Sequence, residues 1–258
     1  ALAVFQIAVM AGLLLTDRLT TTSAVVGMTV GPVLGAVRLA QVSGALRHSG
    51  AVRNTSPWRT LIIDGLSPMA GSISLFLALR LDRIVLAVVA GTRSLGLFTV
   101  ALAVPETLRV LPKAVGQVVA DRGRSGIDSV ATARRHTRLF VAGHGVVLAG
   151  AAAVGWILLP VVFGEGFTDA RDVLLVVTAA EAVLAVHLMH QALLVGFARP
   201  KGIGLPQVVS AVVMVVLVLV MIPAWGIQGA AWASLLGYTA LAGTSTVWTN
   251  RELRRIEA

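Results

Sequence analysis

The chain has 258 residues, of which 57% are hydrophobic and 13% charged, and its formal net charge is +9 at pH 7. Soluble domains carry about 25% charged residues, so the composition excludes an ordinary soluble protein and favours a membrane protein. The basic residues are confined to loops and aromatic residues are few, which argues against nucleic-acid binding, and the lack of cysteine excludes disulfides and thiolate sites.

The apolar segments predict an all-α, polytopic bundle of about eight transmembrane helices. About 20 apolar residues cross the hydrocarbon core of a bilayer, and runs of about that length recur along the chain. In chain order the predicted helices are 1–15, 23–40, 68–91, 95–120, 138–163, 171–197, 206–223 and 228–249. The basic stretch at 41–60 is rich in Gly, Ser and Asn, and we interpret it as the hinge between two helical blocks.

Most of the 21 Lys and Arg residues lie in or beside one alternate set of loops. They are Arg38, Arg47, Arg53, Arg59, Arg109, Lys113, Arg122, Arg124, Arg134, Arg135, Arg138, Arg199, Lys201, Arg251, Arg254 and Arg255. The opposite set of loops holds only Arg18, Arg93 and Arg171. Basic loops remain in the cytoplasm, so we expect a multi-pass protein of the cytoplasmic (inner) membrane with a cytoplasmic C-terminus.

Three charged residues interrupt the apolar segment 68–91, namely Arg80, Asp82 and Arg83. An ionisable group in a span costs several kcal/mol unless it faces water or another charge, so such groups are candidates for function. One interpretation is a cationic lining that meets an anionic substrate. The other is a self-neutralising Asp82–Arg83 pair that only fixes helix packing.

The next segment, 95–120, carries Glu106, Arg109 and Lys113 at i, i+3 and i+7, which predicts one stripe on a helix. The two basic residues could reach the cytoplasmic interface with their long side chains, but this does not explain Glu106. Pro105 and Pro112 flank the stripe, which favours a bent helix that lines a cavity.

Segment 171–197 contains Glu181, His187 and His190, which are candidates for ion coupling or proton relay. Polar packing between helices is the alternative, because two histidines without a matched carboxylate are an incomplete metal-ligand set. We therefore predict no metal and no cofactor. The sequence has no P-loop and no arrangement that singles out a nucleophile, so we predict that the protein is not an enzyme.

Several motifs occur in an order and spacing that point to one family. They are Asp82-Arg83, Gly91, Leu95-Gly96-Leu97-Phe98 and Gly116-Gln117 within 78–119, then LLPVVFGEGFTDA at 158–170, GFARP at 196–200 and MIPAWGIQGAAWASLLGY at 221–238. Residues 78–119 resemble the seventh and eighth helices of bacterial oligosaccharide (O-antigen type) flippases, in the multidrug, oligosaccharidyl-lipid and polysaccharide exporter superfamily. The resemblance covers nearly the whole chain.

The resemblance implies a transporter of two six-helix halves. Residues 1–40 would be the last two helices of the first half, 41–60 a cytoplasmic linker, 61–250 the second half and 251–258 a cytoplasmic tail. Because the chain begins at Ala1, inside an apolar stretch, we expect a fragment that lacks about four N-terminal helices.

The resemblance also implies alternating access, in which an undecaprenyl-pyrophosphate-linked oligosaccharide or polysaccharide precursor crosses the cytoplasmic membrane. Arg80, Arg83, Arg109 and Lys113 would attract the pyrophosphate and sugar charges, since Arg offers forked donors suited to phosphate. Asp82, Glu106 and Glu181 would tune these cations or couple to an ion gradient. The expected partners are the lipid-linked glycan, membrane lipids and glycan polymerase or glycosyltransferases, without nucleic acid.

Two other functions remain open. The first is an ion-coupled exporter of small organic cations, which needs an acidic cavity. The excess of positive charge in 68–120 argues against it, whereas the carboxylates of Asp82, Glu106 and Glu181 favour it. The second is a membrane scaffold without transport activity that assembles glycan-synthesis enzymes.

Overall fold

The computed structural model describes residues 37, 41, 58–197 and 204–257. The chain divides into two compact units, 1–57 and 58–258, and the fold described here is that of the second unit. The predicted helix at 1–15, that at 23–40 apart from residue 37, and most of the linker at 41–60 lie outside the described residues.

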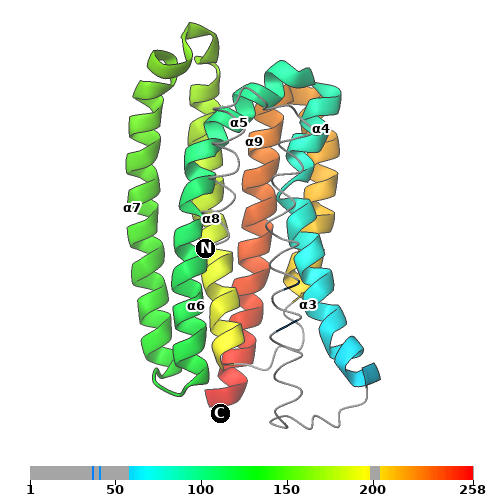
Figure 1. Cartoon of the computed structure of the whole chain (residues 1–258), viewed down its shortest axis with the longest axis vertical. Helices are drawn as coiled ribbons and strands as arrows, with labels where there is room; N and C mark the ends of the chain where they lie inside the picture. The colour runs from blue at the N-terminus through cyan, green and yellow to red at the C-terminus, as the bar shows by residue number, and fades with distance from the viewer. Residues whose placement is uncertain (1–36, 38–40, 42–57, 198–203, 258) are drawn as a thin grey trace. The chain divides into compact units, whose positions relative to one another are not determined.

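Every regular element of the described region is a helix, and that region contains no strand. The elements are α3 (Trp58–Ala78), α4 (Leu81–Val89), α5 (Gly91–Leu108), α6 (Val110–Arg124), α7 (Val130–Phe163), the short 3₁₀ helix η1 (Glu165–Phe167), α8 (Ala170–Phe197) and α9 (Leu205–Glu257). Figure 1 shows the long helices lying side by side. The predicted all-α class is thus confirmed.

Four segments of the described region are long and apolar enough to cross a membrane, by length and composition. They are Gly91–Arg124, Val130–Phe163, Ala170–Phe197 and Leu205–Arg255. This finding is consistent with a membrane protein. It supports four candidate spans in the described region and not the predicted count of eight.

The last of these segments folds back on itself at Gly226. This glycine has φ 55° and ψ −126°, inside what is otherwise one helical run, and a positive φ is readily adopted only by glycine. The two arms of α9 lie side by side (Figure 1), and the Ser210 hydroxyl on the first arm donates to the Gly237 carbonyl on the second at 3.1 Å. The turn falls between the predicted helices 206–223 and 228–249.

The predicted helix 68–91 is broken, because α3 ends at Ala78 and α4 begins at Leu81. Arg80 occupies the position before α4 with non-helical φ and ψ of −127° and −17°. The Asp82 carboxylate then lies in the first turn of α4, where a negative charge interacts favourably with the helix dipole. The break therefore places all three charged residues of this segment around one helix start.

The predicted helix 95–120 is also broken, at Arg109, which separates α5 from α6. Pro112 has no N–H to donate to the Leu108 carbonyl, and it lies in the first turn of α6, where that loss is tolerated. The Arg109 N–H instead bonds to the Glu106 carbonyl at 3.2 Å. The tightened turn brings the charged groups of Glu106 and Arg109 within 3.8 Å of each other.

Helices α7 and α8 have clear starts and stops. The Ser129 hydroxyl caps α7 by accepting from the Thr132 N–H at 3.2 Å, and Gly164, at φ 86°, ends it. Helix α8 packs against α5, α6, α7 and α9, and its Val173, Val177 and Leu184 are fully buried. By contrast, much of α7 is exposed. Side chains that line the site therefore come from α8 and the helices around it.

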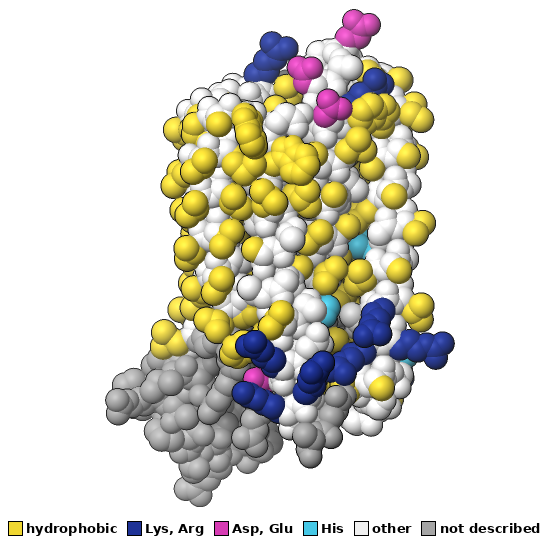
Figure 2. Space-filling model, turned by 180° about the vertical axis from the view of Figure 1, so that it is seen from behind, with side chains coloured by type: hydrophobic (Ala, Val, Ile, Leu, Met, Phe, Trp, Pro, Cys, Tyr) yellow, Lys and Arg dark blue, Asp and Glu magenta, His cyan; other side chains and the backbone are white. Residues whose placement is uncertain are grey.

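The charged side chains gather at the two ends of the unit, with a largely apolar surface between them (Figure 2). Most Lys and Arg residues lie at the end that holds the α6–α7 turn and the C-terminus, whereas the acidic residues near η1 lie at the other end. An apolar surface bordered by charged ends is the arrangement expected of a protein that spans a membrane. The ion pairs described next lie away from both ends.

Candidate functional site

A network of ion pairs connects α4, α5, α6 and α8, with Glu106 at its centre. The Glu106 carboxylate pairs with Arg83, with Arg80 at 3.5 Å and with Arg109 at 3.8 Å. Glu106 lies close to the middle of the 34-residue segment formed by α5 and α6. Three guanidinium groups thus converge on one carboxylate midway along a candidate span.

The most buried pair of the network joins Arg109 to Glu181 of α8. The Arg109 Nε donates to Glu181 Oε2 at 2.8 Å, and Arg109 Nη2 donates to Glu181 Oε1, so the contact is bidentate. The side chains are 9% and 2% exposed. Forked contacts of this kind are the strongest ion pairs and fix the orientation of both groups. This pair therefore holds the break between α5 and α6 against α8.

Asp82 is bound separately from the ion pairs. Its carboxylate accepts from the Arg83 N–H at 2.7 Å and from the Ser234 hydroxyl, on the second arm of α9, at 3.0 Å. Asp82 and Ser234 are both buried, and the buried Tyr238 lies one turn beyond Ser234. The contact joins the start of α4 to the α9 hairpin.

The ion-pair network and Asp82 together are electrically balanced, which the sequence interpretation did not anticipate. Arg80, Arg83 and Arg109 stand against Asp82, Glu106 and Glu181, so the formal charges cancel. Exposure rises along the network, from 2% at Glu181 and 16% at Arg83 to 43% at Arg80. The Arg83 Nε is buried and has no hydrogen-bond partner among the described residues. The open edge of the network is therefore cationic, and the unpartnered Arg83 Nε lies buried behind it.

Lys113 does not take part in this network. It is exposed and lines a groove of about 570 Å³ between α6 and α8, together with Gln117, Asp121, Arg124 and Gln191. The break at Arg109 separates it from Glu106 and Arg109, so the predicted stripe is divided into two environments. The groove lining mixes these polar residues with apolar ones such as Leu75 and Leu188.

The two histidines of α8 contact other residues than those that contact Glu181. His187 is 2% exposed, and its Nδ1 lies 2.6 Å from the Ser245 hydroxyl on α9. His190 Nδ1 lies 2.8 Å from the Val186 carbonyl of its own helix. No hydrogen bond in the described region connects either ring to Glu181. In that region no three His, Asp or Glu residues form a group that could hold a metal ion.

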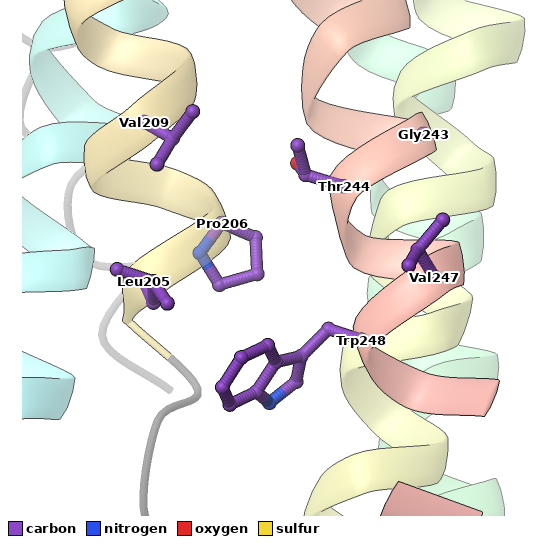
Figure 3. Close-up of a pocket in the computed structure, with 7 residues that line it drawn as sticks. All are labelled: Leu205, Pro206, Val209, Gly243, Thr244, Val247 and Trp248. Carbon is purple, nitrogen blue, oxygen red and sulfur yellow. The ribbon is translucent and has the colours of Figure 1, made fainter. Parts of the chain in front are cut away.

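A second hollow, of about 350 Å³, lies between the two arms of α9 (Figure 3). It is lined by Leu205, Pro206, Val209, Gly243, Thr244, Val247 and Trp248. The indole of Trp248 lies across the gap from Leu205 and Pro206. The lining is almost wholly apolar and holds no ionisable group, so this cleft cannot contribute charge chemistry.

Ser234 and Ser245 are the residues that sequence reasoning missed. Each binds a predicted site residue, yet Ser234 is 152 positions from Asp82 and Ser245 is 58 from His187. Helical periodicity could have placed Ser234 and Tyr238 on one face, at i and i+4. No local signal identifies their partners, since the pairing arises from how α9 packs against α4 and α8.

The structure thus brings six of the nine predicted site residues into one region between α4, α5, α6, α8 and α9. They are Arg80, Asp82, Arg83, Glu106, Arg109 and Glu181, whereas Lys113, His187 and His190 lie outside it.

Comparison with family models, curated proteins and solved structures finds no significant match to this chain.

Proposed function

We propose that the chain is part of a membrane transporter that moves a lipid-linked oligosaccharide or polysaccharide precursor across the cytoplasmic membrane. The proposal combines the resemblance to O-antigen type flippases with the buried network. Under it, the six helical segments of residues 61–250 form the second half of a two-half transporter, and alternating access moves the glycan.

The observation that carries the proposal is the open cationic edge of the network. Arg83 has an unused Nε donor, and Arg80 is 43% exposed beside it. A buried donor without a partner is costly, and a change of conformation that exposes the Arg83 Nε would allow an anionic ligand to accept from it. A pyrophosphate offers several acceptor oxygens that suit the forked donors of arginine. The carboxylate of Glu106 holds these two guanidinium groups in position between transport events.

The exact charge balance favours a second candidate, an ion-coupled exporter of small organic cations. If Arg80 and Arg83 moved away from Glu106, its carboxylate would become available to a cation. This function requires Glu106 to contact the cargo, whereas the glycan function requires Arg83 to do so. The two candidates thus differ in the residue that is essential.

Arg83→Ala is expected to reduce glycan display at the cell surface by about tenfold or more, because a charged hydrogen bond to the cargo is worth about 1.5–3 kcal/mol. Display is measured by lectin or antibody labelling of intact cells, and membrane insertion by immunoblotting of membranes. Arg93→Ala is the matched control, since Arg93 is exposed in the first turn of α5. Normal display by the Arg83 variant, or its loss in both variants, would contradict the assignment.

The proposed orientation places the basic end of the unit in the cytoplasm. At Gly123, beside the α6–α7 turn, a fused reporter that works only in the cytoplasm is then expected to be active. A fusion at Glu165, in η1, is expected to be active only outside the cytoplasm. Paired phosphatase and fluorescent-protein fusions measure both positions, and the reverse pattern would invert the orientation.

A further inference from the structure

We propose that the start of α7 forms a binding site for the headgroup of an anionic phospholipid. A hollow of about 400 Å³ lies there, lined by Ala131, Arg134, Arg135, Arg138 and Leu139. These positions follow the spacing i, i+3, i+4, i+7 and i+8, so they share one face of the helix. Three guanidinium groups therefore border one hollow, and no acidic residue lies among its described lining.

Two described carboxylates at this end of the unit pair with other arginines. Asp128, in the turn before α7, accepts from Arg122 Nε at 2.8 Å and from Arg122 Nη2 at 3.0 Å. Glu252, near the end of α9, pairs with Arg255 at 2.9 Å. The exposed Arg135 and Arg138 have no ion pair with a described residue. Their charge is thus available to an external anion.

The position of the hollow along α7 points to a lipid and not to a soluble anion. From Leu139 onward α7 is apolar, and its outer side chains are exposed, including Leu139 at 61% and Val146 at 72%. Residues 139–163 rise by about 37 Å, enough to cross a hydrocarbon core of roughly 30 Å. The arginines therefore lie where the apolar surface ends, at the depth of lipid headgroups. A molecule with a phosphate above an acyl chain fits both parts.

The chemistry selects an anionic headgroup. Arg donates to two phosphate oxygens at once, and basic residues at a membrane surface each contribute about 1 kcal/mol to the binding of anionic lipid. A zwitterionic headgroup carries the same phosphate, but its ammonium group would be repelled by the three arginines. Phosphatidylglycerol should therefore bind in preference to phosphatidylcholine. The site concerns the lipid around the protein, so it depends on the membrane placement and not on the transported cargo.

The test compares two double variants of the full chain in detergent micelles. Arg135→Gln/Arg138→Gln removes two charges from the hollow, and Arg251→Gln/Arg254→Gln removes two exposed charges from the same end of the unit but outside it. Binding of phosphatidylglycerol is measured by native mass spectrometry or by quenching with a labelled lipid. We expect affinity to fall about tenfold or more in the first variant and by less than about twofold in the second.

Three outcomes would overturn the proposal. Equal losses in both variants would show a general charge effect, and equal binding of phosphatidylcholine by the unmodified chain would show that headgroup charge has no role. Displacement of the lipid by glycerol phosphate at comparable concentration would show a soluble-anion site. Arg135→Lys/Arg138→Lys keeps the charge and should retain most of the affinity, which separates loss of charge from damage to the helix.

Discussion

Replacing Arg109 with methionine is expected to lower the free energy of unfolding by about 3–5 kcal/mol, because Glu181 would remain buried without its bidentate partner. Glu181 is 2% exposed, so water cannot compensate its charge. The Glu106 carboxylate would keep Arg80 and Arg83 as partners. Unfolding by sodium dodecyl sulfate in mixed micelles, followed by circular dichroism, measures the loss.

The double variant Arg109→Met/Glu181→Leu should recover most of this stability, since apolar residues of similar volume often replace a buried ion pair at little cost. Arg93→Met, at an exposed position of α5, is the control and should change stability by less than about 0.5 kcal/mol. A single Arg109 variant as stable as the unmodified chain would mean that the pair does not hold α6 against α8. A double variant as unstable as the single one would assign the loss to packing of the long side chain.

Gly229→Ala is expected to destabilise the α9 hairpin by about 1–3 kcal/mol or more, since a methyl group there would collide with the backbone of Met221 on the other arm. The obstacle is main chain, which cannot move aside as a flexible side chain can. The arms would have to separate near their turn, where the neighbouring Ala230 and Ala231 are fully buried. The same detergent unfolding experiment measures this loss.

Gly243→Ala provides a matched control on the same arm. A Cβ at Gly243 meets no atom within 4 Å, and alanine is favoured over glycine inside a helix by roughly 0.5–1 kcal/mol. We therefore expect the control to be neutral or slightly more stable. If the two variants behaved alike, the close approach of the arms at Gly229 would not be a feature of the folded protein.

The network combines features of the two interpretations of the charged residues. The self-neutralising interpretation paired Asp82 with Arg83, but Arg83 turns its guanidinium to Glu106 and meets Asp82 only through its main-chain N–H. The cationic interpretation counted only residues 68–120, where basic groups exceed acidic ones. Among the six residues that the fold brings together, Glu181 from α8 balances the charges, because Arg93 and Lys113 lie outside this group.

Within the described residues, the sequence by itself determined the all-helical class and the approximate positions of the long apolar helices, because apolar runs of about 20 residues and the loops between them are local properties. It also located the hairpin turn near Gly226 and singled out every ionisable residue of the network, since a charge within an apolar run is conspicuous. It did not predict the break at Arg80; Pro105 and Pro112 predicted a bend in 95–120, and the structure places the break between them, at Arg109.

Only the tertiary structure decided which charges meet. Arg109 and Glu181 are 72 residues apart, and Asp82 and Ser234 are 152 apart, so no spacing rule within one helix could pair them. Their contacts depend on the rotation of each helix about its axis and on which faces pack together. Those are set by the fit of many side chains along α8 and α9, and this fit is a property of the assembled helices.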